Sequence, residues 1–126
     1  MADTGHKVLI VDDDEVVRSL LKKICSQMGS EVVAVSNATD ALKHLKSEKY
    51  SLVIADLIMP VSDGWSFLDK IRENPETRDT PVIIMTGLSL SDDEKTRICS
   101  KCKAVVSKHD FKINEFKNII GEFIKG

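Results

Sequence analysis

Strand-like and helix-like segments alternate along the whole chain, and this alternation restricts the fold more than any other feature of the sequence. Five short runs of mainly apolar residues are typical of buried strands: Lys7–Val11, Glu31–Val35, Leu52–Asp56, Pro81–Thr86 and Ala104–Ser107. Each run is followed by a segment with the signals of a helix, either apolar residues at helical spacing or, after the fourth run, a capping-box pattern. Regular alternation of this kind predicts a parallel sheet with helices on both faces. We therefore expect an α/β fold with a doubly wound, five-stranded parallel sheet.

The expected helices are marked by apolar residues that recur every three or four positions and by signals at the helix ends. Gly29 is expected to end the first helix, Asn74-Pro75 the third, and the capping-box pattern from Ser91 to Glu94 opens the fourth. The apolar positions are Val16, Val17, Leu20, Leu21, Ile24 and Met28; Ala38, Ala41, Leu42 and Leu45; Phe67, Leu68 and Ile71; and Ile113, Phe116, Ile119, Ile120, Phe123 and Ile124.

Length and charge limit the functions that the chain can have. Its 126 residues suit a single domain spanning 1–126, with residues 1–6 as a short polar tail. A net charge of −2 provides no basic field for nucleic acid or an anionic membrane, and no apolar stretch approaches the length of a membrane span. Three cysteines, an odd number, favour a reducing cytoplasm over a disulfide framework. Because the chain ends just after the last predicted helix, we expect no output domain after it.

Chemically active side chains follow four of the five predicted strands. Asp12-Asp13-Asp14 follows the first strand, while Asp56, Thr86 and Lys108 stand at the ends of the third, fourth and fifth. The carboxyl ends of parallel strands share one edge of the sheet, where ligands of such folds bind. Carboxylates there can hold a divalent cation, and a hydroxyl and an ammonium can bind phosphoryl oxygens. Convergence of all four groups indicates a phosphoryl-transfer site.

Each of these residues also has a structural interpretation. An aspartate after a strand is often a helix N-cap or a turn former. A turn after the first strand can direct at most two of its three carboxylates into the crevice. Asp56 arrives separately, and it can be a third metal ligand or a nucleophile that attacks phosphorus to give an acyl phosphate.

These residues resemble a known family, the receiver domain of two-component response regulators, over essentially the whole chain. The order of acidic pair, acceptor aspartate, threonine and lysine is present. The loop Asp56-Leu57-Ile58-Met59-Pro60-x-x-Asp63-Gly64 is similar to the acceptor loop of that family. The resemblance implies the flavodoxin-like strand order 2-1-3-4-5.

The resemblance also implies a role for each residue of the site. Asp56 would accept a phosphoryl group from the phosphohistidine of a sensor histidine kinase or a phosphotransfer protein. Asp13, Asp56 and the main-chain carbonyl of Ile58 would ligate Mg²⁺, for which Mn²⁺ can substitute, and Asp12 would act largely through water. Thr86 and Lys108 would bind phosphoryl oxygens.

The same resemblance describes the surroundings of the phosphoryl group and the output of the switch. Gly87 would leave room for the group, and Ile58 and Leu88 would flank it. Both flanking residues are apolar, so we expect them to restrict the attacking water and give a long-lived phosphoryl group. A downstream protein partner would bind the surface formed by the fourth helix, the last strand and the last helix. The protein would then be a cytoplasmic switch rather than an enzyme acting on other molecules, without direct contacts to nucleic acid or membrane.

Three positions depart from the family or stand outside its pattern. His109 replaces the proline that usually follows the lysine after a cis bond, so the loop is either trans and reshaped or cis and strained. We expect the His109 side chain to be a solvated loop residue. Val105 stands where the family commonly has Tyr or Phe, which puts the usual threonine–aromatic coupling in question. The pair Cys99 and Cys102 is expected to pack at a helix end rather than to act as a redox motif.

Two alternative functions remain open from the sequence. Asp12-x-Asp14 after a strand resembles the opening motif of haloacid-dehalogenase-type phosphatases, although the order of the later residues differs and we expect no cap domain. A receiver-like interaction module that is never phosphorylated is the second alternative. A nucleotide- or flavin-binding module on the same fold would need glycines and hydroxyls in the first loop, where three aspartates stand instead.

Overall fold

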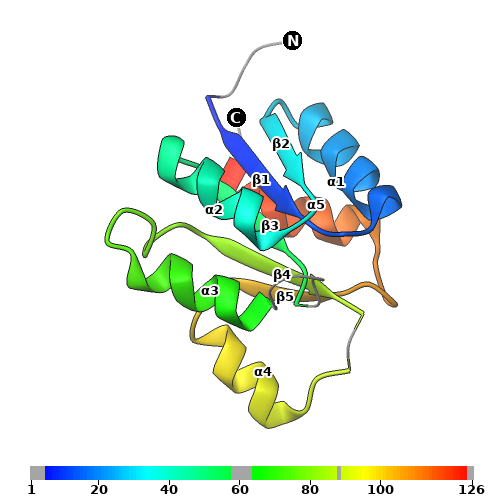
Figure 1. The fold of residues 1–126 in the computed structure, drawn as a ribbon. Coiled ribbons are helices and arrows are strands. Elements are labelled where there is room, and N and C mark those ends of the chain that lie inside the picture. Colours follow the sequence, from blue (N-terminus) through cyan, green and yellow to red (C-terminus); the bar gives the residue numbers. More distant parts are fainter. Residues whose placement is uncertain (1–4, 58–63, 88, 125–126) are drawn as a thin grey trace.

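The five predicted strands form one parallel sheet in the order β2-β1-β3-β4-β5 (Figure 1). The computed structural model describes residues 5–57, 64–87 and 89–124. The strands are β1 Lys7–Val11, β2 Glu31–Val35, β3 Leu52–Ala55, β4 Val82–Thr86 and β5 Ala104–Ser107. The predicted doubly wound fold and its strand order are confirmed.

Helices follow the strands in regular alternation and cover both faces of the sheet (Figure 1). They are α1 Glu15–Gln27, α2 Ala38–Ser47, α3 Gly64–Glu73, α4 Asp92–Cys99 and α5 Ile113–Ile124. Helices α1 and α5 cover one face, and α2, α3 and α4 cover the other. Each crossover therefore carries the chain back to the edge where the strands begin, so that all five parallel strands end at the opposite, carboxyl edge.

The strands are buried on both sides, which explains why they appear in the sequence as continuous apolar runs rather than alternating ones. Leu9, Val53 and Ile84 point to the face covered by α2, α3 and α4. Their strand neighbours Ile10 and Ile54 point to the opposite face, with Phe116 and Ile120 of α5. Successive side chains of a strand thus supply two separate cores, and the sheet is held rigidly between them.

Strand β3 ends one residue earlier than predicted, and β4 begins one residue later. Asp56 lies just beyond β3, yet its backbone N–H still donates to the Val11 carbonyl at 3.1 Å. Pro81 precedes β4 and has no N–H to give to the sheet, although its carbonyl accepts from Val53 at 2.9 Å. Both residues therefore continue the sheet with half of a normal pairing.

The helix ends follow from local hydrogen bonding. The Asp14 carboxylate caps α1 by accepting from the backbone N–H of Val16 at 2.9 Å. Gly29, with φ of 91°, turns the chain after α1. Ser91 and Glu94 form the predicted capping box of α4, since each side chain accepts from the backbone N–H of the other.

Two apolar residues that were expected in buried helix faces are exposed. Val16 is 77% exposed and Ile113 is 45% exposed, whereas later residues of the same helices are buried. Both stand in the first turn of a helix, where the chain has just left the carboxyl end of a strand. The buried residues of α1 and α5 begin further along each helix, so helical spacing alone assigned these two positions wrongly.

Charged side chains connect α3 to α4 and to the residues that follow α4. The guanidinium of Arg97 lies 4.7 Å from the ring centroid of Trp65, and Lys101 forms an ion pair with Asp69. Arg72 donates to the carbonyl oxygens of Lys101, at 2.9 Å, and of two residues before β4. Trp65 is partly buried, and its ring lies against Arg97 of α4.

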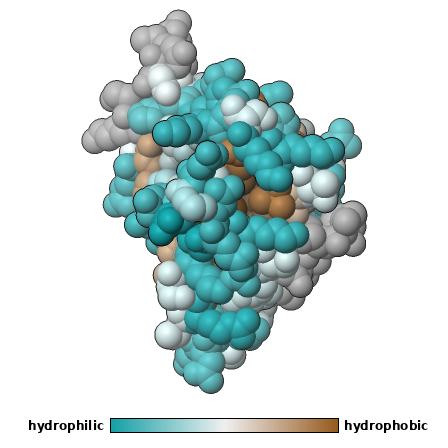
Figure 2. Space-filling view, turned by 60° about the vertical axis from the view of Figure 1, so that its left-hand side comes forward, coloured by the Kyte–Doolittle hydropathy of each residue, from teal (hydrophilic) through white to brown (hydrophobic). Residues whose placement is uncertain are grey.

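Figure 2 shows one face on which hydrophilic residues surround a small, recessed hydrophobic area. Among the residues that the structure describes, no helix combines the length and apolar character required to cross a lipid bilayer.

Candidate functional site

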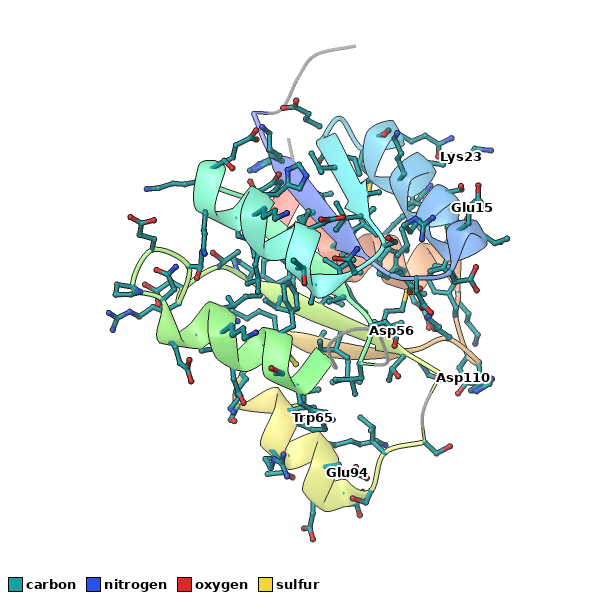
Figure 3. The ribbon with its side chains drawn as sticks, viewed as in Figure 1. Glu15, Lys23, Asp56, Trp65, Glu94 and Asp110 are labelled. Carbon is teal, nitrogen blue, oxygen red and sulfur yellow. The ribbon has the colours of Figure 1, made fainter. Side chains whose placement is uncertain are left out.

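The four predicted groups meet at the carboxyl edge of the sheet. Asp12 follows β1, Asp56 follows β3, Thr86 ends β4 and Lys108 follows β5. Backbone hydrogen bonds hold these ends together, since Lys108 N–H donates to the Thr86 carbonyl at 2.8 Å. Figure 3 shows Asp56 at the end of β3 and Asp110 in the turn after β5, at the same end of the sheet. The predicted convergence is therefore present in the structure.

The Lys108 ammonium lies between two carboxylates. Its Nζ is 2.8 Å from Oδ2 of Asp12 and 2.7 Å from Oδ2 of Asp56. Burial disfavours the charged ammonium, but hydrogen bonds to these two aspartates outweigh burial and leave the pKa of Lys108 above its ordinary value. Lys108 thus acts as an internal counter-ion that keeps two buried carboxylates close together.

The Asp12 carboxyl is the most deeply buried acid of the group, with only 2% of its surface exposed. Burial raises its pKa, against the opposing effect of Lys108 and of the backbone N–H of Asp14, which donates to Oδ1 at 2.9 Å. Arg18 of α1 donates to the Asp12 main-chain carbonyl at 2.8 Å. This contact of Arg18 was missed by the sequence analysis, because nothing in a helical surface position indicates it.

Three carboxylates form a group that could hold a metal ion. One oxygen each from Asp12, Asp13 and Asp56 lie within 4.8 Å of one another. Asp13 is exposed, while the other two are buried, so the group opens toward solvent on one side. Oxygen donors in this number suit Mg²⁺, which keeps several waters. Ile58, the fourth expected ligand, lies outside the described residues.

The third aspartate of the run has a structural task. The Asp14 carboxylate accepts from the backbone N–H groups of Val16, at 2.9 Å, and Val17, at 3.4 Å. It therefore caps α1, as expected from the limit of two inward carboxylates per turn. An aspartate held in this way is poorly placed to act as the general acid that a haloacid-dehalogenase-type phosphatase would require.

The His109 side chain is exposed in the loop after β5, as expected, but nothing in the sequence indicated that its ring has a hydrogen-bond partner. Its Nε2 lies 2.8 Å from the carbonyl oxygen of Gly87, the residue after Thr86. The peptide bond before His109 is trans, since the described residues contain no cis bond. Lys108 nevertheless reaches both carboxylates, so the trans bond does not move its ammonium away from the site.

A cavity of about 530 Å³ lies next to the site, between α4 and β5. Its lining includes Thr86, Leu90, Cys99, Val105 and His109. The position of Val105, where the resembling family commonly has an aromatic ring, thus borders open space. A second cavity, of about 710 Å³, is lined by residues 45–51, 75–77 and 79–81, none of which belongs to the carboxylate group. Leu88, expected to flank the phosphoryl group, lies outside the described residues.

The two cysteines of the C-x-x-C pair differ in their surroundings. Cys99 is exposed at the end of α4, while Cys102 is buried and its thiol lies 3.6 Å from the Ala104 carbonyl. Burial raises the pKa of Cys102 to about 11. Cys102 packs in the core beneath α4, as predicted for a helix-end cysteine.

This arrangement combines a buried carboxylate, a neighbouring ammonium, a hydroxyl-bearing strand end and a set of metal-binding oxygens. Such a set can attach a phosphoryl group to an aspartate and neutralise the charge that develops on its oxygens. The model of the response regulator receiver domain family matches residues 8–120 of the chain. The chain therefore belongs to the response regulator receiver domain family.

Individual relatives agree with this assignment. The chain is 36% identical over 98 residues to the transcriptional regulatory protein GltR of Pseudomonas aeruginosa, an alignment that covers 78% of this chain and 39% of GltR. The chain thus spans well under half of that relative. The receiver domain of a Francisella response regulator superposes with a TM-score of 0.83 at 26% identity, covering 96% of this chain and 98% of that one.

A further solved structure agrees in fold. The receiver domain of the sensor histidine kinase PA1611 from Pseudomonas aeruginosa superposes with a TM-score of 0.84 at 24% identity, over 97% of this chain and 99% of that one. That receiver domain has a magnesium ion coordinated in its active-site cleft.

Proposed function

We propose that this protein is a phosphorylation switch in which Asp56 accepts a phosphoryl group from a phosphohistidine of a sensor histidine kinase or phosphotransfer protein. A carboxylate oxygen of Asp56 forms the new bond to phosphorus. The bond between phosphorus and the donor imidazole breaks, and its electron pair stays on that imidazole, which then takes up a proton. The position of Lys108 between Asp12 and Asp56 is the observation that carries this proposal.

Lys108 and Thr86 receive the transferred group in this proposal. The Lys108 ammonium already contacts the acceptor carboxylate at 2.7 Å, so a small displacement would place it against a phosphoryl oxygen. Thr86 ends the neighbouring strand and is only 1% exposed, which places a hydroxyl in a site of limited water access. Positioned charges and donors of this kind supply most of the catalysis in phosphoryl transfer.

A magnesium ion fits the residues present. Asp12, Asp13 and Asp56 would hold it, and Mn²⁺, which accepts the same oxygen ligands, can replace it. When bound, the cation supplies positive charge to the phosphoryl oxygens. The magnesium-bound cleft of the PA1611 receiver domain supports this part of the proposal by analogy.

The output of the switch is a changed protein surface. A phosphoryl group on Asp56 gains partners in Lys108 and Thr86 and so biases an existing equilibrium of the loops that carry them. The face made by α4, β5 and α5 adjoins these loops and would present the change to a downstream protein. In this proposal the whole of 1–126 is one receiver domain with residues 1–6 as a tail. It catalyses no turnover beyond gain and loss of its own phosphoryl group.

The cytoplasm is the proposed compartment. Cys25, Cys99 and Cys102 are all free thiols, which suits a reducing environment. Direct binding to nucleic acid or membrane is not part of the proposed activity, in keeping with a net charge of −2.

Intact mass after incubation with acetyl phosphate tests the proposal. We expect a gain of one phosphoryl group that requires Mg²⁺ and is absent in Asp56→Asn. Asp14→Asn is a matched control, because it removes a neighbouring acid while asparagine still caps a helix well. The control should gain the group normally. Failure of both acetyl phosphate and a phosphohistidine donor to label a folded wild-type protein would favour the phosphorylation-independent interaction module.

The same samples test the phosphatase alternative. Turnover of a simple phosphate ester, lost on Asp12→Asn or Asp14→Asn, would support haloacid-dehalogenase-type chemistry. We expect no such turnover, because the Asp14 carboxylate is occupied as the cap of α1.

The apolar character of Ile58 and Leu88 gives a further expectation about the phosphorylated state. We propose a long-lived phosphoryl group, because apolar neighbours restrict the attacking water. Ile58→Asn and Leu88→Glu should lose the group faster than the wild type after the donor is removed. Equal or slower loss would count against this explanation.

A further inference from the structure

The turn after β5 holds Lys108 in place although it lacks the cis bond that was considered in the sequence analysis. The Lys108 backbone N–H donates to the Thr86 carbonyl at 2.8 Å, which continues the pairing of β4 with β5. The next residue, His109, donates its own backbone N–H to Ser107 Oγ at 3.2 Å. The turn is therefore folded back on the end of its own strand, with Lys108 at its apex.

The His109 ring adds a contact between the same two chain segments. Nε2 lies 2.8 Å from the carbonyl oxygen of Gly87, one residue beyond the carbonyl that Lys108 uses. Because a carbonyl oxygen can only accept, Nε2 carries the proton of this hydrogen bond. The ring thus extends the connection between β4 and β5 one residue past the last backbone hydrogen bond.

We propose that His109 is a positioning residue that fixes the trans turn after β5 and thereby directs Lys108 toward Asp12 and Asp56. This inference rests on the proposed function, since it concerns how Lys108 is placed for phosphoryl transfer. This chain has no proline after Lys108 to fix the turn, and the His109 imidazole fixes it instead. It also makes Gly87, next to Thr86, and Lys108 move as one unit.

The geometry at Gly87 agrees with a specific contact rather than crowding. A Cβ added at Gly87 would lie 3.8 Å from His109 Nε2, an ordinary van der Waals distance. The Gly87 position is therefore not crowded by the ring, and the hydrogen bond of His109 adds to the backbone pairing that already joins the two segments. Loss of the donor should release the turn without removing a core side chain, because His109 is exposed.

Three substitutions separate the hydrogen bond from the bulk of the ring. His109→Gln carries an amide nitrogen at about the distance of Nε2 from the main chain and can still donate to Gly87. His109→Asn carries its amide nitrogen nearer the main chain, at about the distance of Nδ1, and cannot reach. His109→Ala removes the side chain. A positioning role through the hydrogen bond predicts that Gln is close to wild type and that Asn resembles Ala.

The first readout is the rate of phosphorylation by acetyl phosphate at saturating Mg²⁺. We expect His109→Ala and His109→Asn to be slower by about fivefold to tenfold, the order expected for one lost hydrogen bond, and His109→Gln to be within about twofold of wild type. If His109 acts through Lys108, adding His109→Ala to Lys108→Ala should produce no further loss. Equal rates in all single variants, or additive losses in the double variant, would overturn the proposal.

The second readout does not depend on phosphorylation. Hydrogen exchange of the Lys108 amide reports how often the turn opens, because this amide is bonded to Thr86. We expect exchange to be faster by about fivefold in His109→Ala and His109→Asn and unchanged in His109→Gln. If the variants show these differences in exchange but the wild type takes no phosphoryl group, the proposed function is contradicted and the positioning role remains supported. Unchanged exchange in all variants would overturn the positioning role.

Discussion

Replacing Lys108 by methionine should make the metal-free protein less stable and its stability more dependent on Mg²⁺. Methionine keeps most of the aliphatic stem and removes the ammonium that lies 2.8 Å from Asp12 and 2.7 Å from Asp56. Two buried carboxylates then remain without their counter-ion.

The magnitude follows from the burial of the three groups. Removing one partner of a buried ion pair costs about 3–5 kcal/mol. The side chain of Lys108 is 21% exposed, whereas those of Asp12 and Asp56 are 2% and 7% exposed. Partial screening at the lysine reduces the expected loss in the free energy of unfolding to about 2 kcal/mol. For a chain of this size that loss corresponds to a decrease in Tm of about 8 °C.

The assay is urea unfolding in chelator and in millimolar Mg²⁺, followed by the fluorescence of the single tryptophan. A ligand that binds only the folded state stabilises it by RT ln(1 + c/Kd), where c is the free ligand concentration, so tighter binding at a given concentration gives a larger stabilisation. Because no ammonium competes for the carboxylates in Lys108→Met, Mg²⁺ should stabilise this variant more than the wild type. Lys101→Met is the matched control, since the pair of Lys101 with Asp69 is 38% and 47% exposed and should contribute less than about 1 kcal/mol.

Two results would refute this reasoning. A Lys108→Met protein as stable as the wild type in chelator would mean that the carboxylates do not need a counter-ion. Equal stabilisation of both proteins by Mg²⁺ would mean that the ammonium and the cation do not compete for the same oxygens.

Three further predictions concern other parts of the chain. Asp14→Ala should lower the free energy of unfolding by about 1 kcal/mol through loss of the α1 cap, whereas Asp14→Asn should change it by a few tenths; urea titration compares them. Iodoacetamide should alkylate exposed Cys99 first, because burial raises the pKa of Cys25 to about 12 and that of Cys102 to about 11. Peptide mass mapping of the native protein would show the order of alkylation, and early labelling of either buried thiol would contradict this prediction. Hydrogen bonds within the capping box lower the pKa of Glu94, so the stability that Glu94 gives to α4 should be present above its unfolded-state pKa and lost as pH falls through its folded-state pKa. Amide exchange at the start of α4 should therefore become faster on acidification, and this change should be smaller in Glu94→Gln.

The sequence was sufficient to predict the fold because each strand is buried on both faces and each helix on one. Those two patterns differ in period, so the alternation of β and α is visible without any tertiary information. Val16 and Ile113 show the limit of this reasoning. Periodicity tells which side of a helix an apolar residue is on, but not whether the first turn of that helix is covered by the rest of the fold.

The site could be predicted in part for a similar reason. Asp12, Asp56, Thr86 and Lys108 were found because the end of a strand is a position that sequence reveals and parallel topology brings together. The His109 contact with Gly87 was missed, because it depends on the path of a turn and on the direction of a ring. The Arg18 contact with the Asp12 carbonyl was missed because it joins a helix surface to a main-chain atom.

The contact between Trp65 and Arg97 has a practical consequence for following the switch. A guanidinium 4.7 Å from the centroid of an indole ring alters the emission of that ring, and here the two groups belong to α3 and α4. Any displacement of α4 relative to α3 should therefore change the fluorescence intensity or the emission wavelength of the only tryptophan in the chain. The protein carries its own optical sensor beside the face proposed to signal, so its response to a phosphoryl donor can be timed without attaching a dye.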